Sequence, residues 1–334
     1  MPRLDACFPI IIGLLLPGDA FNLARCSKAL WDIFSSIIKD RYHLMLESAG
    51  IVDDKCLDFR VLQNNYGMLI AGRSAYQIFA GSESHWGPLY LLVGNRYLMK
   101  AVEWLERNGY TCSKKSAPNR PVVHPAMYNG PDWTRRLRRR VAMQSRLQHF
   151  VFEQNNKKIV VTGCPTSPLA TVLNSPRTSC MNVITARRAY CLFPKATFKR
   201  AISYCLNNGH QSTTIPSFMD DDLQPLNVVP VVDDPDLSSA SPVFAGGLRS
   251  LGDSSTWSIC LPPMDGLQCE VEENSAFDVG RDMNSHVPFI DYQEIEYPLL
   301  KFAHVCPAQD AHLYYPMESK WQTARRLLEP NIRI

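Results

Sequence analysis

The sequence predicts an α+β fold, in which a short helical segment at the N-terminus precedes a mixed β-sheet flanked by helices. Three observations support this prediction. Apolar residues recur at helical spacing within the first sixty residues. Strand-like and helix-like segments alternate from Phe59 to Tyr110, which indicates a sheet covered by helices. Two apolar runs also flank Asn155-Asn156, a pattern typical of a β-hairpin.

Composition excludes several broad classes of protein. With 334 residues, of which 46% are hydrophobic, the chain can fill a substantial core, so disorder throughout is not expected. Its 35 basic and 32 acidic residues leave a net charge of +3, too balanced to predict binding to nucleic acid or membrane through bulk electrostatics. The 11 cysteines include no CxxC pair, which favours free thiols in a reducing compartment over a disulfide framework or a zinc site.

The apolar run from Phe8 to Leu16 has some features of a targeting segment. Asp5 lies in the would-be basic leader and Pro9 interrupts the run, which argues against a secretory signal peptide. The run is also shorter than the about 20 apolar residues needed to span a bilayer. We therefore expect an intracellular protein, cytoplasmic or nuclear, that does not enter a membrane.

A turn at Pro17-Gly18 separates this run from a second helical segment. Asp19 is expected to cap that segment by accepting a hydrogen bond from a free amide of its first turn. Its apolar residues predict either one helix or two helices with a kink near Ser35, and the apolar face consists of Leu23, Leu30, Phe34 and Ile37.

This arrangement resembles an F-box, which has an apolar opening helix, a Pro-x-Asp turn and a Leu-rich helix with a lysine near its middle. The resemblance covers about forty residues, and the matching features are the run 10–16, Pro17 with Asp19, and Leu23, Lys28 and Leu30. It implies that an apolar helical surface containing Pro17, Leu23 and Leu30 binds the Skp adaptor of a cullin ubiquitin ligase, without any chemistry. The alternative is a helical N-terminal cap packed on the main domain.

The segment from Met68 to Tyr110 predicts a strand over 68–72, a helix over 73–79, a strand over 89–94 and a helix over 96–110. The last of these helices has a buried stripe formed by Leu98, Ala101, Val102 and Leu105.

The order of these elements resembles the start of the nucleotidyltransferase superfamily. There, a Gly-Ser pair at the start of the helix holds the nucleotide phosphates through free backbone amides and the helix dipole. The second strand then carries an Asp-x-Asp pair that holds Mg²⁺. In this chain the phosphate site would consist of Gly72, Arg73 and Ser74, with Arg73 in place of the pair's serine.

The second strand lacks the acids that the resemblance requires. Pro88 and Tyr90 stand at the two Asp positions, and neither can supply a negative ligand. Glu83 precedes the strand and has no acidic partner at the i+2 spacing that places two side chains on one face. We therefore expect no catalytic residue, no metal and no cofactor at this degenerate site. A family of uncharacterised fungal proteins is similar in the same region, over 70–75, 87–93 and the helix with Trp104-Leu105.

Arg73 has two possible roles. The helix dipole disfavours a cation at a helix N-terminus by about 0.3–1 kcal/mol. Either Arg73 points into solvent, or it replaces the lost metal charge and binds a phosphate or another anion. Gly72-x-Ser74 also resembles part of a nucleophile elbow, but Tyr76 stands at the closing glycine position, so we do not expect Ser74 to be a nucleophile.

The middle of the chain predicts a long loop over 113–133, rich in Pro, Gly and Asn. A basic segment follows, with arginines at 135, 136, 138, 139 and 140, which forms either a solvated helix face or a nucleic-acid contact. The predicted hairpin has strands over 150–153 and 157–162, and Glu153 is expected to be an exposed strand residue.

The second half contains two further segments similar to the fungal family. Residues 179–198 are expected to pack in the interior, with Asn182 and Thr185 bonding buried backbone. A tight turn at Gly252-Asp253 is expected to lead into a strand that contains Trp257. A final strand within 298–307 and a terminal helix over 319–330 complete the prediction.

Two domains follow from these observations: a helical F-box-like segment over 1–56, and a degenerate nucleotidyltransferase-like body over 57–334. The favoured function is a non-catalytic binding or adaptor protein, such as an F-box-type substrate adaptor of a ubiquitin ligase. Two alternatives stay open: a nucleotide-dependent enzyme with relocated acids, and a nucleic-acid binder that uses the arginines at 135–140.

Overall fold

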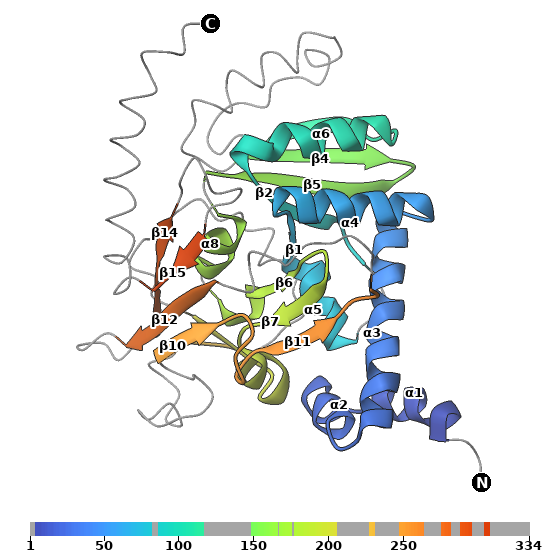
Figure 1. Ribbon diagram of the computed structural model, residues 1–334, viewed down its shortest axis with the longest axis vertical. Helices are drawn as coiled ribbons and strands as arrows, with labels where there is room; N and C mark the ends of the chain where they lie inside the picture. Colours follow the sequence, from blue (N-terminus) through green and yellow to red (C-terminus); the bar gives the residue numbers. More distant parts are fainter. Residues whose placement is uncertain are drawn as a thin grey trace, which may run out of the picture.

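A computed structural model describes residues 4–81, 86–116, 148–165, 167–175, 177–205, 227–230, 247–263, 275–281, 288–295 and 304–307. Its largest element is an eight-stranded sheet (Figure 1). In spatial order the strands are β11 (Trp257–Cys260), β7 (Arg188–Cys191), β6 (Asn182–Ile184), β1 (Leu69–Ala71), β2 (Leu89–Gly94), β5 (Lys157–Cys164), β4 (Gln148–Gln154) and β3 (Thr111–Ser116). Strands β2 and β5 run parallel, and the other neighbouring pairs are antiparallel.

Helices accompany this mixed sheet, so the α+β class is confirmed. The α-helices are α1 (Leu4–Leu14), α2 (Pro17–Ala24), α3 (Lys28–Ala49), α4 (Asp54–Tyr66), α5 (Gly72–Ala80), α6 (Leu98–Arg107) and α8 (Pro168–Leu173). Short 3-10 helices are η1 (Asn95–Tyr97) and η3 (Thr178–Cys180), and η4 (Lys195–Lys199) is a single π-helical turn.

Smaller sheets lie beside the main one. Strands β10 (Gly247–Ser250), β12 (Ala276–Arg281) and β13 (Pro288–Asp291) form one, β14 (Gln293–Ile295) pairs with β15 (His304–Cys306), and β8 (Ile202–Cys205) pairs with β9 (Asn227–Pro230). Strand β15 lies within the predicted final strand. The predicted terminal helix and the arginines at 135–140 lie outside the described residues.

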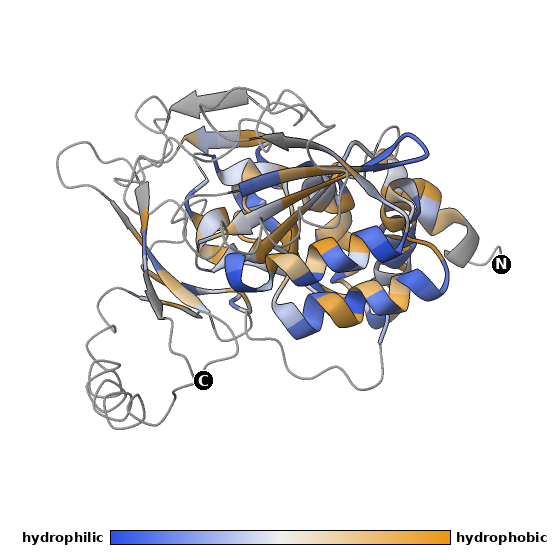
Figure 2. Cartoon of the chain, turned by 90° about the horizontal axis from the view of Figure 1, so that it is seen from above, coloured by the Kyte–Doolittle hydropathy of each residue, from blue (hydrophilic) through white to orange (hydrophobic). Residues whose placement is uncertain are grey.

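The two faces of the main sheet bury different side chains, because successive residues of a strand point to opposite faces. Ile70 of β1 pairs with Leu91 of β2, and both contribute to the core formed with α3, α5 and α6. Leu69 pairs with Leu92, and both lie in a second core with α8 and the three-stranded sheet. Figure 2 shows the hydrophobic colouring of the central strands between these layers.

Several predicted elements match the structure closely. Strand β2 has the predicted bounds, and the expected stripe of α6 is buried, with Leu98, Ala101, Val102 and Leu105 each at most 2% exposed. The hairpin forms between β4 and β5, where Asn155 and Asn156 adopt φ angles of 49° and 63°. A two-residue turn with both φ angles positive matches the twist of the flanking strands.

Four details of the prediction were wrong. The helical segment after Pro17 breaks at residues 25–27 instead of near Ser35, because Ser27 caps α3 by accepting a hydrogen bond from the amide of Leu30 at 3.2 Å. Pro17 and Gly18 form no turn and Asp19 is no cap, because α2 begins at Pro17 and these residues lie in its first turn. Residues 113–116, expected to begin the long loop, instead form the end of β3, which pairs with β4 across a bulge.

The helical head packs directly on the rest of the protein. Phe21 of α2 stacks on Trp257 of β11, with ring centroids 4.1 Å apart and ring planes inclined by 14°. Gly18 lies so close to η4 that a Cβ atom there would be 3.0 Å from the carbonyl oxygen of Phe198. These contacts fit the hypothesis of a helical cap, and the domain boundary near residue 56 stays a prediction. No helix among the described residues is long and apolar enough to cross a membrane.

Candidate functional site

The predicted phosphate site lies where β1 enters α5. Gly72 has a φ of +66°, a conformation that glycine adopts without strain, and Ala71 before it is extended. The chain therefore turns sharply from strand to helix at this residue. The amides of the first turn of α5 have no side-chain cap.

Strand β2 and the loop before it pack against this predicted site. Tyr90 of β2 pairs with Ala71, and its ring approaches Gly72 so closely that a Cβ atom there would be 3.3 Å from the Tyr90 ring. The hydroxyl of Ser74 donates a hydrogen bond to the carbonyl oxygen of Pro88 at 3.3 Å, and Ser74 is only 2% exposed. The Tyr90 ring therefore lies directly against Gly72, and the Ser74 hydroxyl already has a backbone partner on the loop before β2.

Arg73 lies along the neighbouring loop instead of projecting wholly into solvent. Its side chain is half-buried, and its Cδ atom is 3.7 Å from the position of a Cβ atom on Gly87. Glu83 lies outside the described residues. Within the described ranges, no three His, Cys, Asp or Glu side chains come together to hold a metal ion.

No family model, curated protein or solved structure matches the chain. The likenesses to an F-box, to nucleotidyltransferases and to the fungal family therefore stay predictions, and the function must be argued from this chain alone.

The position of Tyr90 beside Gly72 leads to a prediction about nucleotide binding. We expect calorimetry to detect no Mg²⁺-dependent binding of ATP, because the Tyr90 ring lies against Gly72 and β2 itself carries no carboxylate that could hold the metal ion. A Ser74→Ala variant is the control for this site. Magnesium-dependent heat in the wild type that disappears in Ser74→Ala would show that the first turn of α5 does accept phosphates.

Residues 179–198 have the structural role that the sequence predicts. The Asn182 amide donates to the carbonyl oxygen of Ser179 at 2.6 Å, and the Thr185 hydroxyl donates to that of Arg188 at 3.0 Å. Both side chains are at most 2% exposed, so they bond buried backbone as expected.

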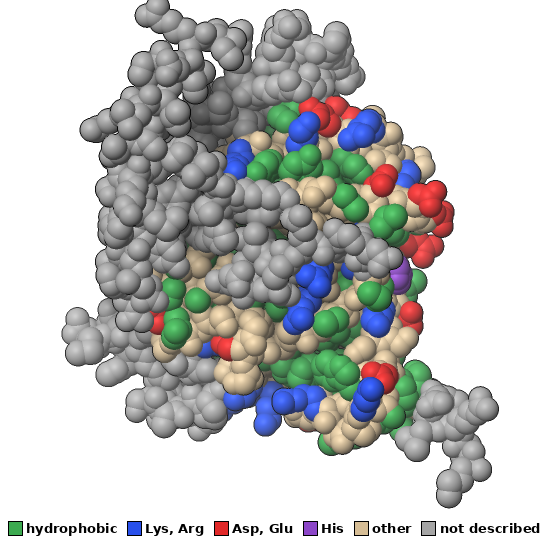
Figure 3. All heavy atoms as spheres, in the orientation of Figure 1, with side chains coloured by type: hydrophobic (Ala, Val, Ile, Leu, Met, Phe, Trp, Pro, Cys, Tyr) green, Lys and Arg blue, Asp and Glu red, His purple; other side chains and the backbone are tan. Residues whose placement is uncertain are grey.

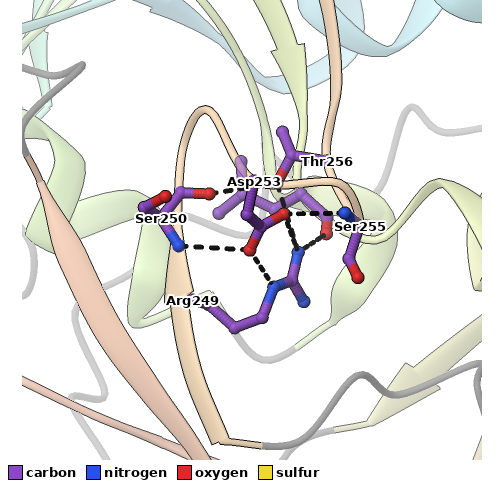
Figure 4. Close-up of polar contacts among 6 residues, drawn as sticks. Arg249, Ser250, Asp253, Ser255 and Thr256 are labelled. Carbon is purple, nitrogen blue, oxygen red and sulfur yellow. Dashed lines mark hydrogen bonds and ion pairs between the residues drawn. The ribbon is translucent and has the colours of Figure 1, made fainter.

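The predicted turn at Gly252-Asp253 is organised by a partly buried ion pair (Figure 4). Arg249 is 3% exposed, and its guanidinium donates to the Asp253 carboxylate and, at 2.9 Å, to the carbonyl oxygen of Leu192. The same carboxylate accepts hydrogen bonds from the amides of Ser250 at 3.1 Å and Ser255 at 2.9 Å. The turn is thereby fixed in front of Trp257.

Charge and hydrogen bonding determine the protonation state of the Asp253 carboxyl in this turn. Burial alone would raise the pKa of Asp253, but the hydrogen bonds and positive charge of Arg249, with the Ser250 amide, hold that pKa below its usual value. The Asp253 carboxylate therefore stays ionised at neutral pH, where it pairs with the Arg249 guanidinium.

The residues predicted to contact the adaptor are partly buried within the protein. Pro17, Leu23 and Leu30 are each half-buried, and Leu23 and Leu30 pack against the main core. Most exposed large apolar residues of the head lie instead on and just after α1: Ile10 is 66% exposed, Ile11 42%, Leu14 82% and Leu16 61%, while Leu44 on α3 is 44% exposed. The i, i+3, i+4, i+7 spacing of Cys7, Ile10, Ile11 and Leu14 is the sequence signal that indicates this second stripe.

Proposed function

We propose that the protein is a non-catalytic binding protein whose helical head docks onto an adaptor, in the manner of an F-box-type substrate adaptor of a cullin ubiquitin ligase. The observation that carries this proposal is the exposed apolar stripe of α1. Two features support the non-catalytic part: the Tyr90 ring lies against Gly72, and β2 carries no acidic side chain that could hold a metal ion.

Helix α1 has two apolar stripes with different environments. Phe8 and Ile12 lie one turn apart and are buried against the head, at 2% and 4% exposure. Ile10, Ile11 and Leu14 project from the other side into solvent. A surface helix of a globular protein is usually polar on its outer side, so a second apolar stripe indicates a surface that a partner covers.

The free energy gained by covering the stripe favours a protein partner with an apolar surface. Covering one large aliphatic side chain completely contributes about 1.5–3 kcal/mol. The stripe has no charged residue among Ile10, Ile11 and Leu14, so an apolar surface such as that implied for the Skp adaptor fits it. No other chemistry is required of the head.

The test is a pull-down of purified Skp adaptor with the full chain. Wild-type protein should retain the adaptor, and Ile10→Asp with Leu14→Asp should weaken binding by at least about tenfold, because two charges would face an apolar partner. Both side chains are exposed, so the substitutions should leave folding intact.

The matched control is a pair with the same spacing on another helix. Leu57 and Val61 of α4 are 54% and 39% exposed, and Leu57→Asp with Val61→Asp should retain the adaptor. Leu23→Asp and Leu30→Asp are poorer probes, because those side chains also pack against the core. Failure of the wild type to retain the adaptor would remove the F-box part of the proposal.

A further inference from the structure

A pocket lies between the corner that joins α2 to α3 and the segment that leads into β11. Its volume is about 440 Å³, within the range of about 300–1,000 Å³ that is typical of small-molecule sites. Residues from both ends of the described chain line it, among them Phe21, Arg25, Lys28, Trp31, Ser254 and Trp257. In the view of Figure 3, Lys and Arg side chains border hydrophobic ones in the region of α2 and β11.

We infer that this pocket binds a small molecule that combines a flat apolar ring with a phosphate monoester group. This binding is separate from the docking proposed for α1, since the two surfaces share no residue.

The apolar wall of the pocket is rigid. Phe21 stacks on Trp257 at 4.1 Å and meets the ring of Trp31 edge-on, at 5.6 Å and 82°. Trp257 also stacks on Phe198, at 5.6 Å and 11°. Because these neighbours fix Trp257, the wall is already in place before a ligand arrives, and a flat ring can contact the exposed parts of the half-buried Trp31 and Trp257 without ordering side chains.

The charged part of the pocket is positive and uncompensated. Arg25 and Lys28 are exposed, and neither side chain forms an ion pair or a hydrogen bond with another residue of the described ranges. The acid of the pocket, Asp253, is already bound to Arg249 and to the amides of Ser250 and Ser255 (Figure 4). Two positive charges therefore face the pocket without a partner.

The N-terminus of α3 adds to the positive electrostatic potential at the pocket. Lys28 is the first residue of this 22-residue helix, whose N-terminus carries a partial positive charge. Two cations with a helix N-terminus favour a doubly charged phosphate over a singly charged carboxylate, because each charge of the ligand gains an attractive interaction. The exposed hydroxyl of Ser254 is a further donor in the lining.

Calorimetric titration of the full chain with three probes tests the inference. Phenyl phosphate has both features, inorganic phosphate lacks the ring, and benzyl alcohol lacks the charge. Phenyl phosphate should bind more tightly than either fragment, and its affinity should fall as salt is added. Arg25→Gln with Lys28→Gln should weaken its binding by about tenfold or more, because two charge-assisted contacts are lost.

Two control variants test whether the loss of phenyl phosphate binding is specific to this pocket. Arg107→Gln removes an exposed cation of α6 and should bind phenyl phosphate like the wild type. Ile10→Asp with Leu14→Asp should also bind it normally, which separates this site from the proposed docking of α1. The inference is overturned if phenyl phosphate does not bind, if it binds no better than inorganic phosphate, or if Arg25→Gln with Lys28→Gln leaves its affinity unchanged.

Discussion

Replacement of Arg249 by methionine is expected to lower the free energy of unfolding by about 3–5 kcal/mol, since it leaves the partly buried Asp253 carboxylate without its partner. It also removes the donor to the carbonyl oxygen of Leu192, which joins the 249–256 segment to the segment after β7. Urea denaturation followed by circular dichroism at neutral pH measures the effect.

The pH dependence of this difference is a second measurement on the same variant. The pKa of Asp253 in the folded protein lies below its unfolded value of about 3.9, so its contribution to stability is complete above that value. The contribution disappears as the pH falls through the folded pKa. The stability difference between wild type and Arg249→Met should therefore be largest near neutral pH and should shrink below about pH 4. A difference that stays constant into strong acid would contradict the role assigned to Asp253.

Truncation of Trp257 to alanine should have an effect of similar size, about 3–5 kcal/mol on the free energy of unfolding. The indole lies between Phe21 and Phe198, so its removal leaves a gap between α2, η4 and the main sheet. Chemical denaturation monitored by far-UV circular dichroism gives the loss.

Trp257→Phe is the matched variant, because a smaller ring still fills part of the space between the two neighbours. It should retain more than half of the stability that Trp257→Ala loses. If Trp257→Ala lies within about 1 kcal/mol of the wild type, the aromatic stack contributes far less than its geometry indicates.

Local sequence patterns were sufficient to predict those elements whose structure depends on neighbouring residues of the chain. Strand β2 and the stripe of α6 follow from apolar periodicity, and the β4–β5 hairpin follows from Asn155-Asn156. The break between α2 and α3 was placed wrongly, because the apolar spacing continues through it and Ser27 ends the continuity with one hydrogen bond. The start of the long loop was wrong because polar residues of β3 are held by pairing with β4.

The candidate sites depend on contacts between distant segments, which periodicity does not reveal. The absence of acidic residues over 88–94 is visible in the sequence, but the position of the Tyr90 ring against Gly72 is not. Likewise, Arg249 and Trp257 suggested only a turn and a strand. Their partners Leu192 and Phe21 could be found only from the folded chain.

The stack of Phe21 on Trp257 has a consequence for biosynthesis. The ribosome releases α2 and α3 long before residue 257 emerges, so Phe21 can pack on Trp31 and Phe34 but lacks its stacking partner Trp257 for most of the time that the chain takes to be made. Nascent protein truncated before β11 should consequently need chaperone protection that the finished chain does not.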